Sequence, residues 1–180
     1  MENYEVQLIM RWENDGVQAK TPVLPEGVTV ETFNERENAL NEWLDIVQYG
    51  LSNGLMGAEY YENCMTSREL YKENMCNFIV KDGKAIATIT VICDYDKKEG
   101  YIHMVACKPE CRGQGFGTLL NDIALYILKR EGMQTAHLTT DDFRIPAIKS
   151  YLRCGFTPDR STEDFCKRWD KIYEVIEQKG

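Results

Sequence analysis

Residues 105–118 decide the fold, and they read Val105-Ala106-Cys107-Lys108-Pro109-Glu110-Cys111-Arg112-Gly113-Gln114-Gly115-Phe116-Gly117-Thr118. The stretch begins like a β-strand, continues as a basic, glycine-rich turn and ends where apolar residues recur at helical spacing as far as Gly132. The turn is therefore expected at a helix N-terminus, where backbone N–H groups lack partners and the helix dipole favours an anion. Glycines let the backbone approach a phosphate, and Arg112 adds positive charge. The pattern predicts a pyrophosphate-binding turn, although such turns also occur without a ligand.

Two other nucleotide-binding patterns contain glycine-rich turns, and neither fits this chain. A dinucleotide-binding fingerprint follows the first strand of its domain and is followed by an acidic residue about twenty positions later. Here the turn lies past the middle of the chain, and three strand-like segments precede it. The kinase-type phosphate loop continues into Gly-Lys-Ser/Thr, which does not follow this turn.

Composition restricts the class of protein. The chain has 180 residues, 43% of them hydrophobic, and a formal net charge of −8. These values favour one domain with a sizeable core, and a small or basic substrate over nucleic acid. No apolar run reaches the roughly 20 residues of a membrane span, and the acidic residues 1–5 do not resemble a secretory signal. We therefore expect a cytoplasmic protein that binds neither nucleic acid nor a membrane, with its seven cysteines as reduced thiols.

The remaining sequence predicts a mixed order of strands and helices. Strands are expected at residues 4–12, 28–33, 77–81, 85–93, 101–107 and 135–140, and helices at 36–51, from the glycine-rich turn to Gly132, at 146–153 and at 164–179, with one or two short helices in 55–76. Asp82-Gly83 predicts a tight hairpin turn, and apolarity on both faces of 101–107 predicts a central strand. An antiparallel meander followed by a strand-helix-strand crossover indicates an α/β (α+β mixed) fold, a central mixed sheet with helices on both faces.

Two motifs carry a family resemblance. The signature Arg/Gln-x-x-Gly-x-Gly/Ala is met by Arg112, Gly115 and Gly117, and a later pattern is met by Ala147, Tyr151, Gly155 and Phe156. With these motifs in this order, the chain resembles the GNAT superfamily of acyl-CoA-dependent N-acyltransferases over residues 77–157, and more loosely over 28–76. The resemblance implies one acetyltransferase domain, 1–180, whose acyl-CoA-binding core is 77–157. An N-terminal strand extension, 1–27, would lengthen the sheet or cover its edge, and a C-terminal helix within 161–180 would pack on the domain or form a dimer contact.

The resemblance also implies a cofactor and the residues that bind it. The strand before the turn would splay from its neighbour, and the backbone of Val105, Ala106 and Cys107 would pair with pantetheine. The pyrophosphate would be held by Arg112, Gly113, Gln114, Gly115, Phe116, Gly117 and Thr118. Tyr151 would protonate the leaving thiolate, or else be a core aromatic with a satisfied hydroxyl. The implied reaction is direct transfer of an acetyl group from acetyl-CoA to a primary amine of a small molecule or peptide, without a metal, by a monomer or homodimer.

The general base is where this chain departs from the family. Positions at which relatives often carry Glu fall on Tyr101 and Thr139, and the Asn often found before the second motif is replaced by Arg144. The missing carboxylate leaves a second hypothesis open, a non-catalytic acyl-CoA-binding sensor or interaction module.

His103 is our candidate for the second catalytic residue. Strand alternation predicts it on the same face as Val105 and Cys107, where it would act through water; Asp141 and Asp142 are alternative bases. A buried, hydrogen-bonded structural role is the competing interpretation of His103.

The cysteines near the turn raise two questions, whether they bind a metal and whether one of them is exposed. His103, Cys107 and Cys111 are spaced by four, but on a strand and a turn this spacing does not bring three ligands to one metal. Cys111, beside Arg112 at a helix start, is the thiol expected to be most exposed and modifiable.

Overall fold

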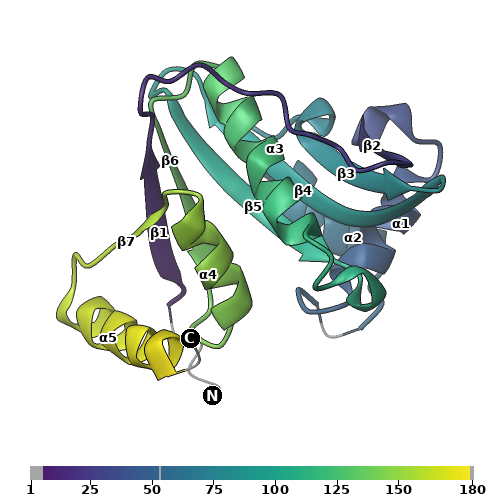
Figure 1. Ribbon diagram of the computed structural model, residues 1–180. Helices are drawn as coiled ribbons and strands as arrows, with labels where there is room; N and C mark the ends of the chain where they lie inside the picture. Colours follow the sequence, from purple (N-terminus) through teal and green to yellow (C-terminus); the bar gives the residue numbers. More distant parts are fainter. Residues whose placement is uncertain (1–5, 53, 179–180) are drawn as a thin grey trace.

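The computed structural model describes residues 6–52 and 54–178, and its strands form one seven-stranded sheet in those residues (Figure 1). The spatial order is β2-β3-β4-β5-β6-β1-β7. The strands are β1 Leu8–Glu13, β2 Val28–Thr32, β3 Cys76–Lys81, β4 Lys84–Asp94, β5 Glu99–Cys107, β6 Thr135–Thr140 and β7 Thr157–Pro158. The helices are α1 Ala39–Val47, α2 Ala58–Tyr61, α3 Phe116–Arg130, α4 Ile145–Arg153 and α5 Glu163–Gln178, with short 3-10 turns at Phe33–Glu35, Glu73–Met75 and Pro109–Cys111 and a π-helical turn at Glu62–Thr66.

Strands β2 to β5 form an antiparallel meander, and α3 then connects β5 to the parallel strand β6. The hairpin between β3 and β4 turns at Asp82 and Gly83, whose φ angles of 50° and 76° are the positive values that the Asp-Gly pair predicts. Strand β5 lies in the middle of the sheet. The predicted mixed α/β fold, with its crossover, is confirmed.

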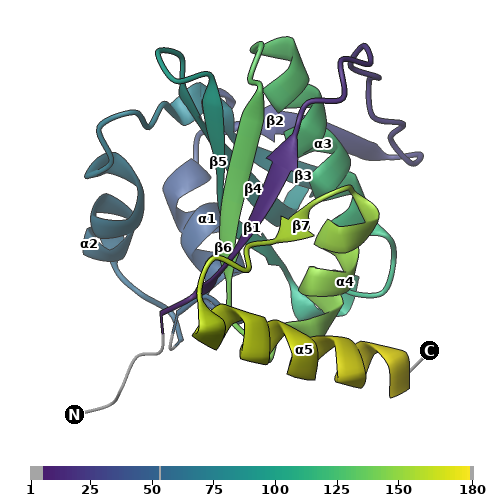
Figure 2. The ribbon, with the colours of Figure 1, turned by 90° about the vertical axis from the view of Figure 1, so that its left-hand side faces the viewer.

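Helices cover both faces of the sheet, so the sheet is the middle layer (Figures 1 and 2). Helices α3 and α4 lie on one face and α1 and α2 on the other, while α5 lies beside α4. One hydrophobic cluster joins α3, α4 and α5 to β1 and β6, and a second lies beneath α1 and α2 around the buried Trp43 and Phe78. None of the helices in the described part of the chain is long and apolar enough to cross a membrane.

The C-terminal helix is held by a cap and a buried tryptophan. Thr162 Oγ1 accepts a hydrogen bond from the Phe165 N–H at 3.1 Å and so caps the start of the helix. The fully buried Trp169 donates from Nε1 to the Asp159 carbonyl at 3.0 Å. Helix α5 therefore packs on its own domain; residues 179 and 180 of the predicted helix lie outside the described residues.

The two N-terminal strands lie in different parts of the sheet. The strand predicted at 4–12 is β1, which begins at Leu8; residues 4 and 5 lie outside the described part. It pairs antiparallel with both β6 and β7, whereas β2 lies at the opposite edge beside β3, so the two N-terminal strands are not neighbours. Strand β1 takes this place because Leu8, Met10 and Trp12 alternate into the core of α3 and α4.

The first helix is shorter than predicted. Residues 36–38 are not part of α1, because the chain first closes a 3-10 turn in which Glu35 Oε2 accepts a hydrogen bond from the Thr32 N–H at 2.7 Å. Arg36 then forms an ion pair with Glu42 at 2.5 Å, across the start of the helix.

Candidate functional site

The site lies where β5 and β6 separate. The two strands pair only from Glu99 opposite Thr135 to Ile102 opposite Leu138, and beyond this point their ribbons diverge (Figure 1). The predicted splay of β5 is thus present. A cavity of about 190 Å³ opens there. Its walls are formed by Gln7, Leu51, Arg68, Tyr101, Ile102, His103, Met104, Val105, Leu138, Thr139, Thr140, Arg144, Ala147 and Tyr151.

A β-bulge at Met104 changes which side chains of β5 face the cavity. Two residues, Met104 and Val105, lie opposite the single residue Ile89 of β4, and Met104 has a φ of 55°. A positive φ at a non-glycine residue within a strand is a strained geometry often found at functional sites. The bulge interrupts the alternation, so Val105 packs toward α3 while His103 contacts Cys64 on the α2 side. The prediction that His103 shares a face with Val105 and Cys107 is therefore wrong.

The glycine-rich turn has the geometry of an anion cradle. Gly113 and Gly115 have φ angles of 74° and 87°, and Gly115 is the N-cap of α3. Within residues 6–52 and 54–178, no protein acceptor lies within hydrogen-bond distance of the backbone N–H groups of residues 113–118. A Cβ added at Gly113, Gly115 or Gly117 would meet no protein atom within 4 Å. The residues fit an external anion such as a pyrophosphate.

Arg112 connects this turn to the loop after α1. Its Nη2 donates to the Tyr49 carbonyl at 2.5 Å, and its Nε donates to the Cys107 carbonyl at 3.3 Å. The guanidinium thus adds positive charge beside the cradle, and it also ties the end of β5 to the loop that borders the cavity.

Tyr151 belongs to the cavity wall. The residue is 7% exposed, and its hydroxyl has no hydrogen-bond partner in the part of the protein that the structure describes. Burial raises the pKa of Tyr151 to about 12, while the charge of Arg144 acts in the opposite direction. A tyrosine hydroxyl without a protein partner, on a residue of the cavity wall, is free to donate a hydrogen bond to a bound ligand.

His103 lies in the cavity wall with both ring nitrogens engaged. Nδ1 lies 3.1 Å from the Tyr101 hydroxyl, and Nε2 lies 3.0 Å from the Cys64 carbonyl and 3.1 Å from Arg68 Nε. Burial, and then the charge of Arg68, lower the pKa of His103 to about 4. The ring is therefore neutral at pH 7 and a weak base.

The two alternative bases are held in ion pairs. Asp142 accepts from Arg168 Nε at 3.0 Å, and this bond lowers the pKa of Asp142. Burial alone would raise the pKa of Asp141, but hydrogen bonds from Gln7 and Arg144 outweigh it and hold that pKa below its usual value. Neither aspartate belongs to the cavity wall.

Sequence reasoning did not place Arg68 at the cavity, and it misplaced Cys111. Arg68 lines the cavity, but it lies in the segment 55–76, where no periodicity marked a functional position. Cys111, expected to be exposed, is 8% exposed because it packs in the core cluster beneath α3. Among the described residues, no group of three or more His, Cys, Asp or Glu side chains could hold a metal ion.

Comparison with known proteins identifies the family of the chain. Residues 38–156, more than half of the chain, match the Acetyltransferase (GNAT) family. The chain belongs to the GNAT acetyltransferase family. Mycothiol acetyltransferase of Streptomyces griseus is 30% identical over 140 residues, which cover 76% of this chain and 45% of that protein. N-alpha-acetyltransferase 30 of Schizosaccharomyces pombe is 38% identical over 71 residues, 37% of this chain and 47% of that protein.

Solved structures show the same GNAT fold. A GCN5-related N-acetyltransferase from Sphaerobacter thermophilus superposes with a TM-score of 0.69 at 21% identity, covering 84% of this chain and 48% of that one. The ribosomal-protein-S18-alanine N-acetyltransferase of Escherichia coli gives a TM-score of 0.59 at 19% identity, covering 72% of this chain and 77% of that one. The present chain spans about half the length of the mycothiol acetyltransferases with which it aligns over 140 residues or more.

Proposed function

We propose that this protein is an acetyl-CoA-dependent N-acetyltransferase that transfers an acetyl group directly to a primary amine of a small molecule or peptide. The observation that carries the proposal is the row of N–H groups at 113–118 without a protein acceptor among the described residues, next to a splayed strand edge and a cavity lined by Tyr151. Membership of the GNAT family and the names of the curated relatives support the same reaction. The proposed compartment is the cytoplasm, and the proposed assembly is a monomer or homodimer.

Backbone groups form the donor side of the site, the part that would bind the acetyl donor, acetyl-CoA. Acetyl-CoA would supply an activated acetyl thioester. The N–H groups of 113–118, with the charge of Arg112, would hold its pyrophosphate. Beyond Ile102, the edge of β5 that faces β6 has no strand partner among the described residues, so Val105, Ala106 and Cys107 can pair with the amide-bearing pantetheine arm as an added strand would.

Tyr151 is the proposed proton donor. Its raised pKa, about 12, keeps the phenol protonated at pH 7. As the amine nitrogen bonds to the acetyl carbon, the carbon–sulfur bond breaks and the leaving thiolate takes the Tyr151 proton. A free thiol has a pKa of about 8.5, which lies below that of the phenol, so the site must stabilise the phenolate as the proton moves.

In the proposed reaction, no carboxylate acts as the general base that removes the proton of the amine. No Asp or Glu belongs to the described cavity wall, and His103 is too weak a base to hold a proton at pH 7. We propose that removal from water in the cavity lowers the pKa of a bound amine, so that the neutral nucleophile is favoured. Water would receive the remaining proton, and His103, whose two ring nitrogens contact Tyr101, Cys64 and Arg68, would hold this part of the wall in place.

Two measurements test the proposal in sequence. The thermal midpoint should rise with acetyl-CoA but not with ADP or NAD, because a ligand that binds only the native state stabilises it by mass action. A panel of amines should then give acetyl transfer. Tyr151→Phe should lower turnover by about 10²-fold with little change in acetyl-CoA affinity, a typical loss for one general acid. Tyr173→Phe on α5 is the matched control and should behave like wild type.

The second hypothesis, an acyl-CoA-binding sensor, makes the opposite prediction at the second step. Tight acetyl-CoA binding without transfer to any amine would favour it. Loss of acetyl-CoA affinity in Tyr151→Phe as large as the loss of turnover would contradict the proton-donor role.

A further inference from the structure

We infer that the acceptor is an amine that also carries an anionic oxygen group, a carboxylate or phosphate, which binds to Arg68 at the α2 side of the cavity. The inference rests on the proposed function, because it names the class of amine that the same site would accept. It is drawn from the charges of the cavity wall and the contacts that hold them in place.

Arg68 is exposed to solvent, and two contacts hold its Nε in place. Its Nε donates to the Cys64 carbonyl at 2.8 Å and lies 3.1 Å from His103 Nε2, and its guanidinium carbon is 5.5 Å from the centre of the Tyr101 ring. Among the residues that the structure describes, no carboxylate lies within 4.0 Å of its nitrogens. These contacts use Nε and the guanidinium face, so both terminal nitrogens are left for a planar oxyanion.

Arg68 does not belong to the donor side of the site. It contacts Tyr101 and His103, whose side chains lie on the α2 side of β5, whereas Val105 and the start of α3 lie on the other side of the bulge. The pyrophosphate cradle therefore does not explain this charge. An anion at Arg68 must come with the second substrate.

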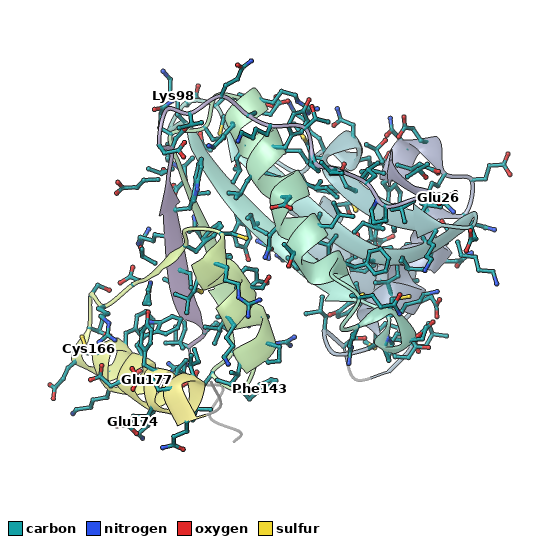
Figure 3. All side chains as sticks on the ribbon, viewed as in Figure 1. Glu26, Lys98, Phe143, Cys166, Glu174 and Glu177 are labelled. Atoms are coloured by element: carbon teal, nitrogen blue, oxygen red, sulfur yellow. The ribbon has the colours of Figure 1, made fainter. Side chains whose placement is uncertain are left out.

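Arg144 provides a second, weaker attraction. Its Nε forms an ion pair with Asp141 at 2.7 Å, which balances most of its charge, and its Nη2 donates to the Gly50 carbonyl at 2.6 Å. The ring of Phe143 lies 5.3 Å from the guanidinium carbon and is itself 76% exposed at the loop before α4 (Figure 3). These contacts hold Arg144 in the cavity wall and leave it little free charge, so Arg68 is the side chain that attracts an anion more strongly.

The local charge has the opposite sign to the charge of the whole chain. The net charge is −8, yet the charged side chains of the described cavity wall are Arg68 and Arg144. A polyamine or a lysine-rich peptide would place additional positive charge against these guanidinium groups. An amine joined to an anionic group would instead keep its nitrogen near Tyr151 and its oxyanion at Arg68, and the cavity of about 190 Å³ restricts the buried part to a small molecule or a chain end.

The test is a binding titration that needs no turnover. Protein saturated with CoA is titrated calorimetrically with three matched pairs: L-alanine and L-alaninamide, 4-aminobutyrate and 4-aminobutyramide, and O-phosphoethanolamine and ethanolamine. The anionic member of at least one pair should bind at least about tenfold more tightly than its neutral partner, and the pair that responds distinguishes carboxylate from phosphate. The preference should weaken with added salt.

Variants assign the preference to Arg68. Arg68→Gln should abolish it, Arg68→Lys should retain part of it, and Arg153→Gln, an exposed arginine on α4 away from the cavity, should leave it unchanged. Equal affinity within every pair, no binding by any anionic member, or a preference that persists in Arg68→Gln would each overturn the inference.

Measuring acetyl transfer to the same amines tests the anion site and the proposed transferase activity separately. Anionic amines that bind through Arg68 but receive no acetyl group would refute the transferase and leave the anion site standing. Acetylation of the neutral partners at the same kcat/KM as the anionic amines would support the transferase and refute the anion site.

Discussion

Gly115→Ala tests the pyrophosphate cradle, because its effects on stability and on binding come from different causes. Gly115 has a φ of 87°, and a Cβ there would touch no protein atom within 4 Å. The cost to the folded protein is therefore the left-handed backbone of a non-glycine residue, about 1–2 kcal/mol. For a chain of this size, that cost lowers the thermal midpoint by roughly 2–8 °C.

The binding effect should be larger than the stability effect. The open space above Gly115 is where we place the pyrophosphate, so the new methyl group would displace it from at least one N–H donor. A hydrogen bond to a charged group contributes about 1.5–3 kcal/mol, so acetyl-CoA affinity should fall by about 10- to 150-fold. Calorimetric titration of acetyl-CoA measures the affinity, and the thermal midpoint without ligand measures the stability.

Two controls use the same change of side chain. Gly132, at the other end of α3, has a φ of 75° and equally open space; Gly132→Ala should lose the same stability and keep wild-type affinity. Gly117 lies in the first turn of α3 without a positive φ, and the family signature admits Ala there. Gly117→Ala should bind acetyl-CoA normally and be slightly more stable, since Ala favours a helix over Gly. Wild-type affinity in Gly115→Ala, or an equal loss in Gly132→Ala, would refute the cradle.

Three further predictions concern protons and packing. The pKa of His103 is about 4 in the folded protein against 6.5 ordinarily, so the unfolded chain takes up the proton first as the pH falls. The free energy of unfolding of wild type should therefore fall by up to about 3 kcal/mol relative to that of His103→Gln between pH 6.5 and pH 4. Urea unfolding at each pH measures this difference, and parallel stability profiles of the two proteins would contradict it. Gly100→Ala would place a Cβ 2.0 Å from Leu128 Cδ2 and should cost about 1–3 kcal/mol by overpacking; an unchanged urea midpoint would show that Leu128 moves aside. The acidic limb of the pH profile of kcat/KM should move with the pKa of the acceptor amine; a limb that stays fixed for all amines and disappears in His103→Gln would assign the base to His103.

The elements predicted correctly from sequence have local signals. Asp82-Gly83 requires a tight turn because of its own backbone preferences, and the apolar spacing after Thr118 produces α3 because one face of that helix meets the sheet. The glycine-rich turn was recognised for the same reason, since its backbone conformation is a property of consecutive residues. These signals need no knowledge of what lies elsewhere in the chain.

The features that were missed depend on partners far away in sequence. Alternation predicts that β1 is a strand, but it does not reveal that Leu8 pairs with Thr140. The positive φ of Met104 is imposed by the register of β4 and β5, and methionine itself has no preference for it. Arg68 becomes a cavity residue only because α2 and the following turn bring it over Tyr101. Non-local packing of this kind has no signature in a single sequence.

The bulge at Met104 gives β5 two independent surfaces. Before it, Tyr101 and His103 face the proposed acceptor side; after it, Val105 and Cys107 face the other. A change of side chain at Tyr101 or His103 therefore alters the wall that meets the acceptor while the backbone edge that would bind the donor stays in place. Such a strand can acquire a new acceptor through single substitutions without losing the donor, which would suit a fold reused for many different amines.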